Sequence, residues 1–176
     1  GALVLGGQHV PFAGLGRALL YTWRIDAALV HSREALALSP RFALTHVLLA
    51  EAFIAQNKYA DALQEARTAA SLDADPPGSS YVAMVGVALD LTGDRTAARK
   101  QQAILEARAR HQYVSGVSMG WLDSQLGDND KAFANLARAV ADHDHLMLPV
   151  IASRGDSWQS DPRFGKLMHE MGLPLH

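Results

Sequence analysis

Four consecutive residues, Asp142-His143-Asp144-His145, are the strongest candidates in the sequence for metal chemistry. Imidazole and carboxylate groups are common protein ligands of zinc. Alternation of the two residue types in a helix end or a turn, however, does not bring four side chains together on one ion. The chain has eight histidines, but none of them forms the HExxH spacing of a catalytic zinc site. We therefore expect no metal site.

Other patterns that support catalysis are not found either. Gly14-Leu15-Gly16 places two glycines inside a predicted helix and does not form a GxGxxG phosphate loop after a strand. The sequence contains no GxSxG nucleophile elbow. The absence of cysteine excludes disulfides and thiol catalysis, and is compatible with a reducing compartment. We expect a protein that binds other molecules, with no enzymatic activity and no cofactor.

The composition predicts an all-α protein. About half of the 176 residues (49%) are apolar and only 7% are aromatic, as expected where helices pack through small side chains. The net charge of −2 predicts no broad attraction to nucleic acid or to an anionic membrane. The basic residues of Arg95–Arg110 are interpreted as a solvated helix face, because no aromatic residues interleave with them. No apolar run is long enough to span a membrane, and we expect a cytoplasmic location.

A small residue followed twelve positions later by alanine recurs along the chain and predicts helical hairpins. Small residues are needed where two antiparallel helices cross closely, since larger side chains would push the helix axes apart. The spacing holds in four pairs, which follow one another at nearly equal intervals: Gly16/Ala28, Ala50/Ala62, Gly86/Ala98 and Gly120/Ala132. Helices are predicted at Ile25–Leu38, Arg41–Gln56, Tyr59–Leu72, Arg95–Arg110 and Asn129–Ala141.

The interval between pairs, about 34 residues, resembles the period of the tetratricopeptide repeat family. The resemblance covers residues 9–146 and implies a right-handed α-solenoid of four antiparallel hairpins, at residues 9–42, 43–76, 79–112 and 113–146. Residues 1–8 are interpreted as an edge of the chain or the end of an upstream element. The break at Asp73–Ser80 makes the middle interval slightly longer than the other two. We interpret it as a longer loop between stacked repeats, and a hinge between two sub-domains is the alternative.

Residues 147–176 are predicted to form a C-terminal capping segment with a final helix. Asp161 can cap this helix, Pro162 fits its first position, and Gly172 and Pro174 end it. The run Ser160–Phe164 followed by Gly172-Leu173-Pro174 is similar to the C-terminal end of bacterial multidomain proteins in which tetratricopeptide repeats follow a signalling or DNA-binding module. Trp158-Gln159 stand where that pattern has Leu-Arg. The resemblance implies a regulatory module in the same polypeptide.

In the tetratricopeptide family the first helices of the repeats line a concave groove. Carried over to this sequence, the candidate groove residues are Arg17, Leu20, Tyr21, Leu44, Val47, Glu51, Ile54, Ala83, Val87, Asp90, Val117 and Trp121. Most are apolar, with Arg17, Glu51 and Asp90 as isolated charges. For Trp121, packing in the core is the alternative to a place in the groove.

An apolar groove suits an amphipathic helix or apolar peptide segment of a protein partner, or of the same polypeptide. We therefore predict a non-catalytic interaction scaffold that contacts neither nucleic acid nor a membrane. Two alternatives stay open. The groove could be filled by self-association, as a homodimer or by intramolecular packing, or it could close into a receptor for a small apolar ligand.

Overall fold

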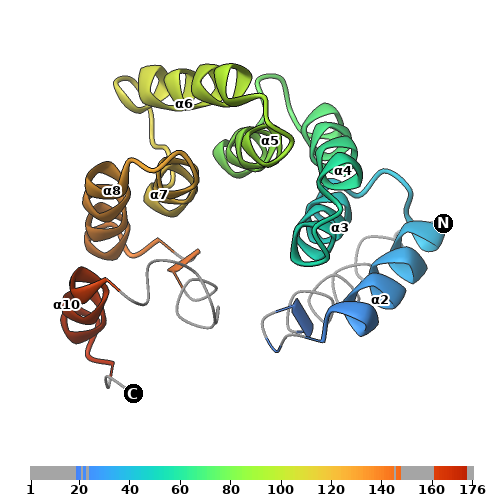
Figure 1. The fold of residues 1–176 in the computed structure, drawn as a ribbon, viewed down its shortest axis with the longest axis horizontal. Coiled ribbons are helices and arrows are strands. Elements are labelled where there is room, and N and C mark those ends of the chain that lie inside the picture. Colours follow the sequence, from blue (N-terminus) through green and yellow to red (C-terminus); the bar gives the residue numbers. More distant parts are fainter. Residues whose placement is uncertain (1–18, 21, 23, 145, 148–160, 174–176) are drawn as a thin grey trace, which may run out of the picture. The chain divides into compact units, whose positions relative to one another are not determined.

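The computed structural model describes residues 19–20, 22, 24–144, 146–147 and 161–173. This part of the chain contains eight α-helices, and its fold class is all-α, as predicted (Figure 1). None of these helices is both long enough and apolar enough to cross a membrane. The helices are α2 Ile25–Leu38, α3 Ala43–Ala55, α4 Tyr59–Leu72, α5 Ser79–Leu91, α6 Arg95–Ala109, α7 Gly116–Gln125, α8 Asn129–Ala141 and α10 Pro162–Glu170.

The chain divides into two compact units, an N-terminal unit of residues 1–81 and a C-terminal unit of residues 82–176. The boundary lies in the first turn of α5, directly after the break at Asp73–Ser80. Within this break the backbone N–H of Gly78 donates to the Asp73 carboxylate at 2.7 Å, which folds the loop back on itself. The N-terminal unit holds α2, α3 and α4, and the C-terminal unit holds the rest.

Most predicted helix limits agree with the structure. The predicted limits of α2, α4 and α8 are the observed ones. The helix predicted at Arg41–Gln56 begins two residues later, because Phe42 is extended and serves as the N-cap. Helix α6 ends at Ala109, one residue before the predicted Arg110, which is the C-cap. The predicted first helix before Thr22, Gly16 of its small pair and the edge at 1–8 lie outside the described residues.

One type of turn recurs where the first helix of a hairpin ends. A backbone N–H donates to the carbonyl oxygen five residues earlier, which is the hydrogen bond of a Schellman motif. These bonds are 2.9 Å long in the first three turns and 2.8 Å long in the fourth, and they join Arg24 to Leu19, Lys58 to Phe53, Asp94 to Leu89 and Asp128 to Asp123. The four donors follow one another at the same intervals as the small pairs, including the slightly longer middle one.

The residue before the donor is left-handed in three of these turns. Its φ angle is 59° at Asn57, 93° at Gly93 and 79° at Gly127. Glycine and, to a lesser degree, asparagine adopt this region without the penalty that other side chains carry. The three positions are therefore occupied by the residue types that let the chain reverse within a few residues and start the next helix.

Two of the small pairs lie where the helices of a hairpin pack together, in α3–α4 and in α7–α8. Ala50 and Ala62 of the α3–α4 hairpin are fully buried. In the α7–α8 hairpin, a Cβ atom added to Gly120 would lie 3.0 Å from the carbonyl oxygen of Ala132. Gly86 of α5 has a different neighbour, because an added Cβ would meet the side chain of Leu122 in α7 at 2.8 Å. Gly86 therefore allows α7 of the following hairpin to approach α5 closely.

Each unit has its own apolar core. In the N-terminal unit the buried cluster consists of Leu19, Leu20, Ala28, Leu29, Leu48, Leu49 and Ala52. In the C-terminal unit a cluster around α7, α8 and α10 consists of Val117, Phe133, Leu136, Ala139, Met147 and Leu167. Helix α3 is buried on more than one side, since every residue from Thr45 to Ala50 is buried.

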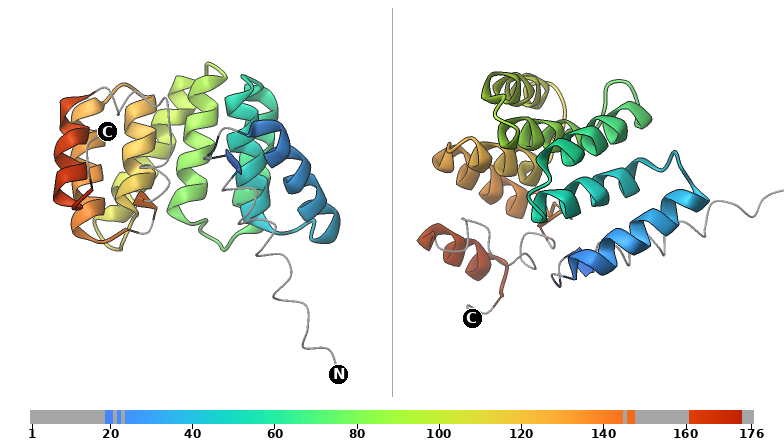
Figure 2. Two further views of the ribbon diagram at one scale, coloured as in Figure 1. Left: turned by 90° about the horizontal axis from the view of Figure 1, so that it is seen from below. Right: turned by 45° about the vertical axis from the view of Figure 1, so that its right-hand side comes forward.

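The predicted final helix is confirmed as α10, which packs against α8 (Figure 2). The Asp161 carboxylate caps it by accepting the N–H of Arg163 at 2.9 Å, and Pro162 occupies its first turn. Arg163 also pairs with Asp130 of α8 at 2.7 Å and lies 4.3 Å above the Phe133 ring. Gly172 ends the helix with a φ angle of 70°. Ser160, Trp158-Gln159 and Pro174 lie outside the described residues.

Replacement of Gly116 by alanine is expected to destabilise the C-terminal unit. An added Cβ would lie 2.3 Å from the Asn135 carbonyl oxygen and 2.9 Å from Ala139, so α7 and α8 must move apart. Overpacking of this kind costs about 1–3 kcal/mol, against a gain of about 1 kcal/mol in helix propensity. The difference is a net loss of up to about 2 kcal/mol, which urea unfolding followed by circular dichroism would measure.

The matched control is Ala134→Ser on the exposed side of α8, which should change the free energy of unfolding by less than about 0.5 kcal/mol. A Gly116→Ala protein as stable as this control would show that the two helices do not approach each other so closely.

Candidate interaction surface and buried polar network

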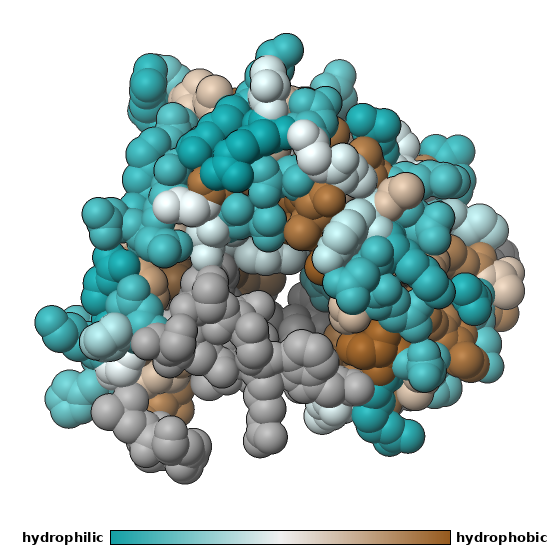
Figure 3. All heavy atoms as spheres, in the orientation of Figure 1, coloured by the Kyte–Doolittle hydropathy of each residue, from teal (hydrophilic) through white to brown (hydrophobic). Residues whose placement is uncertain are grey.

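The candidate groove residues of the N-terminal unit differ in how far they reach solvent. Leu20 and Val47 are buried, with 9% and 6% of their surfaces exposed, and Leu20 belongs to the core cluster. Leu44, Glu51 and Ile54 of α3 are half-buried. Arg17 and Tyr21 lie outside the described residues. Hydrophobic residues over α2 and α3 gather in patches among hydrophilic ones (Figure 3).

In the C-terminal unit most candidate groove residues are part of the interior. Ala83, Val87 and Val117 are all buried. Trp121 is half-buried and packs against the cluster that contains Val117 and Phe133, so it contributes to the core while keeping part of its surface exposed. Among the described candidates, those that reach solvent in part are therefore Leu44, Glu51, Ile54, Asp90 and Trp121.

Asp90 is not the isolated charge that the sequence predicts. Its carboxylate accepts a hydrogen bond from the Gln125 side-chain amide at 2.8 Å and lies 3.5 Å from the Arg95 guanidinium. Only 9% of its side chain is exposed. Asp90 therefore joins α5 to α7 within the fold, and a partner would have to displace these contacts in order to use it.

A second polar cluster, which no sequence motif predicts, lies between α6, α7 and α8. Its centre is Asp123, with 1% of its surface exposed. The two carboxylate oxygens each accept a side-chain amide hydrogen bond of 2.7 Å, one from Gln102 of α6 and one from Asn135 of α8. A buried carboxylate is tolerated only where such partners replace its lost hydration.

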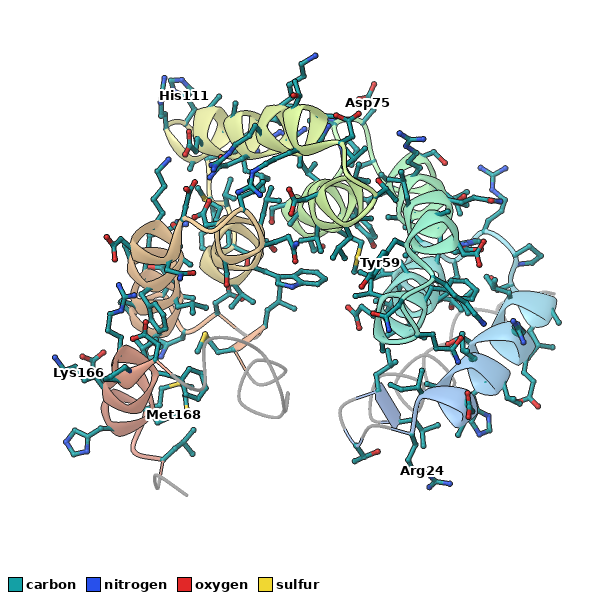
Figure 4. The ribbon with its side chains drawn as sticks, viewed as in Figure 1. Arg24, Tyr59, Asp75, His111, Lys166 and Met168 are labelled. Carbon is teal, nitrogen blue, oxygen red and sulfur yellow. The ribbon has the colours of Figure 1, made fainter. Side chains whose placement is uncertain are left out.

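Two arginines of α6 connect the third hairpin to the turn of the fourth. Arg99 forms a bidentate pair with Asp128 and also donates to the Leu126 carbonyl oxygen. Arg95 donates to the same carbonyl oxygen. Arg95 is nevertheless exposed, in agreement with the interpretation of α6 as a solvated basic face, whereas Arg99 is half-buried in these contacts and departs from it. Lys100 and Arg110 are exposed, and His111 points away from the end of α6 (Figure 4).

The cluster has opposite effects on its two carboxyl groups. Hydrogen bonds from Arg99 and Gln102 lower the pKa of Asp128 to about 2. Burial raises the pKa of Asp123, although the amides of Gln102 and Asn135 act in the other direction. The Arg99 guanidinium joins α6 to the turn at Asp128.

The described part of the Asp142–His145 run forms hydrogen bonds that join the end of α8 to the start of α7. Asp144 is buried, and its carboxylate accepts the Ser115 hydroxyl at 2.6 Å and the Leu146 N–H at 3.0 Å. The Ser115 oxygen in turn caps α7 by accepting the N–H of Ser118. No three potential ligands of a metal ion come together among the residues that the structure describes. His145 lies outside them.

The N-terminal unit contains a smaller polar contact of the same kind. His46 of α3 lies 2.6 Å from the Glu65 carboxylate of α4 through Nδ1, and 3.1 Å from the Pro40 carbonyl oxygen through Nε2. His46 therefore links α3 to α4 and also to the connection between α2 and α3. Its side chain is largely buried, at 10% exposure.

The repeat spacing does contain a signal for the polar cluster. Residues three or four positions apart lie on the same face of a helix. Gln102 lies four residues after Ala98, Asn135 three after Ala132, and Asp123 three after Gly120. Because each of those small residues marks the crossing face of its helix, all three polar side chains could have been placed in the interior.

No protein-family model matches the sequence, and no curated protein matches it. These comparisons therefore assign the chain to no family.

Replacement of Asp128 by asparagine is expected to lower stability more at neutral pH than in acid. Because the pKa of Asp128 is about 2 in the folded protein and 3.8 ordinarily, its ionic contribution is complete above about pH 4 and is lost as the pH falls through 2. For a partly exposed pair we expect a loss of about 1 kcal/mol or less at pH 7. Urea unfolding at pH 7 and at pH 3 should show the difference between variant and wild type shrinking.

Asp142→Asn, at an exposed carboxylate of the same unit, is the control for a general effect of charge. A loss for Asp128→Asn that is equally large at both pH values would contradict the ionic role of the pair.

Proposed function

We propose that this chain is a non-catalytic interaction scaffold of the tetratricopeptide type. The single observation that carries the proposal is the recurrence of one closed turn, with its N–H to carbonyl bond across five residues, at the same nearly constant interval as the small pairs. A period of about 34 residues with helix–turn–helix units is the signature of that family. The buried pair Ala50/Ala62 and the close contact of Gly120 with Ala132 support the proposal further.

In this proposal the four hairpins stack as a right-handed solenoid and α10 covers the apolar side of the last one. Repeats of this kind need a terminal element with a polar outer surface. Helix α10 has that character, because Met168 is buried while Lys166 points outward to solvent (Figure 4). The similarity of the C-terminal run to bacterial multidomain proteins supports a role linked to a signalling or regulatory module in the cytoplasm.

The partner surface we propose is centred on Leu44, Glu51 and Ile54 of α3. These residues share one side of the helix, since they are seven and three positions apart, and each is half-buried rather than buried. Trp121 offers a comparable half-buried aromatic on α7. An amphipathic helix or apolar peptide of a protein partner suits such a surface, because apolar anchors at helical spacing can pack against the parts of these side chains that reach solvent.

The proposal can be tested with Leu44→Glu/Ile54→Glu. Two carboxylates in the apolar surface would have to be desolvated by a bound helix, so affinity should fall at least about tenfold, or about 1.4 kcal/mol. The probe is a displayed library of amphipathic helical peptides selected on the wild-type chain, and binding of the selected peptides is then measured by isothermal titration calorimetry. Val47 is unsuitable for this test because it is buried and a glutamate there would disturb folding.

The matched control is Val30→Glu, which introduces the same charge at a residue of α2 that is 51% exposed. Circular dichroism must first show that both proteins are folded. Peptides that bind the control and the Leu44→Glu/Ile54→Glu protein equally would refute the proposed surface. Failure to select any peptide, together with a dimer in light scattering, would replace the scaffold by self-association.

A further inference from the structure

Asp123 lies at the centre of a hydrogen-bonded relay that runs from one arginine to another. On one side Arg99 donates to the Gln102 side-chain oxygen at 2.9 Å, and the Gln102 amide donates to Asp123 Oδ1 at 2.7 Å. On the other side Arg138 donates to the Asn135 side-chain oxygen at 3.2 Å, and the Asn135 amide donates to Asp123 Oδ2 at 2.7 Å. The relay therefore crosses α6, α7 and α8.

The two arginines fix the direction of both amides. Each amide presents its oxygen to a guanidinium and its nitrogen to the carboxylate. A flipped amide would turn its oxygen toward the carboxylate and its N–H groups toward the guanidinium, and would lose both hydrogen bonds. The arrangement is thus specific for a carboxylate without a proton, which only accepts hydrogen bonds.

A protonated Asp123 does not fit this arrangement. Its new O–H group needs an acceptor, whereas the amides of Gln102 and Asn135 both present N–H donors. One of the two amides must therefore lose its hydrogen bond to Asp123. Gln102 is held more firmly, because its nitrogen also donates to Asp128 Oδ2 at 3.0 Å and its bond from Arg99 is shorter than the bond from Arg138 to Asn135. We therefore expect protonation of Asp123 to break the hydrogen bond from Asn135 of α8 and to leave the one from Gln102 in place.

We propose that Asp123 is a proton-operated latch, which holds Asn135 of α8 while it is ionised and releases that amide, but not Gln102, when it is protonated. The latch belongs to the C-terminal unit alone and does not depend on the proposed partner surface. No covalent step is involved, since one proton is taken up and one hydrogen bond is exchanged.

The charges around Asp123 favour opposite states. From α6, Arg99 attracts the ionised form, and from α8, Lys131 does the same. The Asp128 carboxylate in the turn favours protonation, and Asp90 of α5 acts on Arg99. Arg138 of α8 reaches the latch through Asn135. Burial outweighs the attractive contacts and raises the pKa of Asp123 above its ordinary value of 3.8.

The sign of this shift means that the latch can open without unfolding. A carboxyl whose pKa is raised in the folded state binds its proton more tightly there than in the unfolded chain, so proton uptake adds to stability. Asp128 behaves differently, because its pKa of about 2 places its own protonation at lower pH. The two events are therefore separated along the pH axis.

The experiment is a nuclear magnetic resonance titration of the whole chain from pH 7 to pH 3, observing the Asp123 carboxyl carbon and the side-chain amides of Asn135 and Gln102. We expect the Asn135 amide to follow the carboxyl carbon with one midpoint above pH 3.8. Its rate of exchange with water, taken relative to that of the Gln102 amide at the same pH, should rise about tenfold on release. The Gln102 amide should stay unchanged over this range. An Asn135 amide that does not respond, or two amides that move together, would overturn the proposal.

Asp128→Asn provides the matched variant and does not alter the titrating group itself. The substitution replaces the charged second acceptor of Gln102 by a neutral amide oxygen, which accepts a weaker hydrogen bond. Gln102 should then also respond when Asp123 is protonated. If Gln102 stays unchanged in Asp128→Asn, then Asp128 is not what makes the latch directional, and the proposal is wrong in that respect.

Discussion

The close crossing of paired helices is the constraint on which the rest of the structure depends. At Gly120 the backbone of α7 lies so near α8 that a methyl group would press on the Ala132 carbonyl oxygen. Such a contact is reached only if the chain reverses sharply, and the left-handed residue in the connecting turn makes that possible. The turn and the crossing are therefore two parts of one requirement in the α3–α4 and α7–α8 hairpins, and the turn itself recurs at a nearly constant interval.

Polar contacts supplement this packing in the C-terminal unit. Between α6, α7 and α8 the interior holds Asp123, Gln102 and Asn135 instead of aliphatic side chains. A buried ion adds little net stability, because its desolvation offsets much of its attraction to partners. It does favour one arrangement of α6, α7 and α8 over slightly shifted ones, since a shift of any of these helices would leave a charge or an amide without a partner.

What is encoded locally can be predicted from the sequence. The limits of α2, α4 and α8 follow from nearby turn residues and from the apolar period, and the cap of α10 follows from Asp161 and Pro162. Contacts made by residues distant in the chain cannot be predicted in this way. Arg99 looks like a solvated residue of a basic helix until Asp128, in the following turn, is placed beside it. For the same reason, the burial of Val87 does not follow from its own helix.

The break between α4 and α5 shows how the chain absorbs a change of length. Two more residues separate these hairpins than separate the others, yet the next closed turn forms with the same hydrogen bond. The extra length is taken up at Ala74–Pro76, which are exposed, while the bond from Gly78 to Asp73 draws the ends of the loop together. A short tag or a reporter domain inserted at Ala74 would accordingly interrupt neither α4 nor α5, which makes this loop the natural site for engineering the chain.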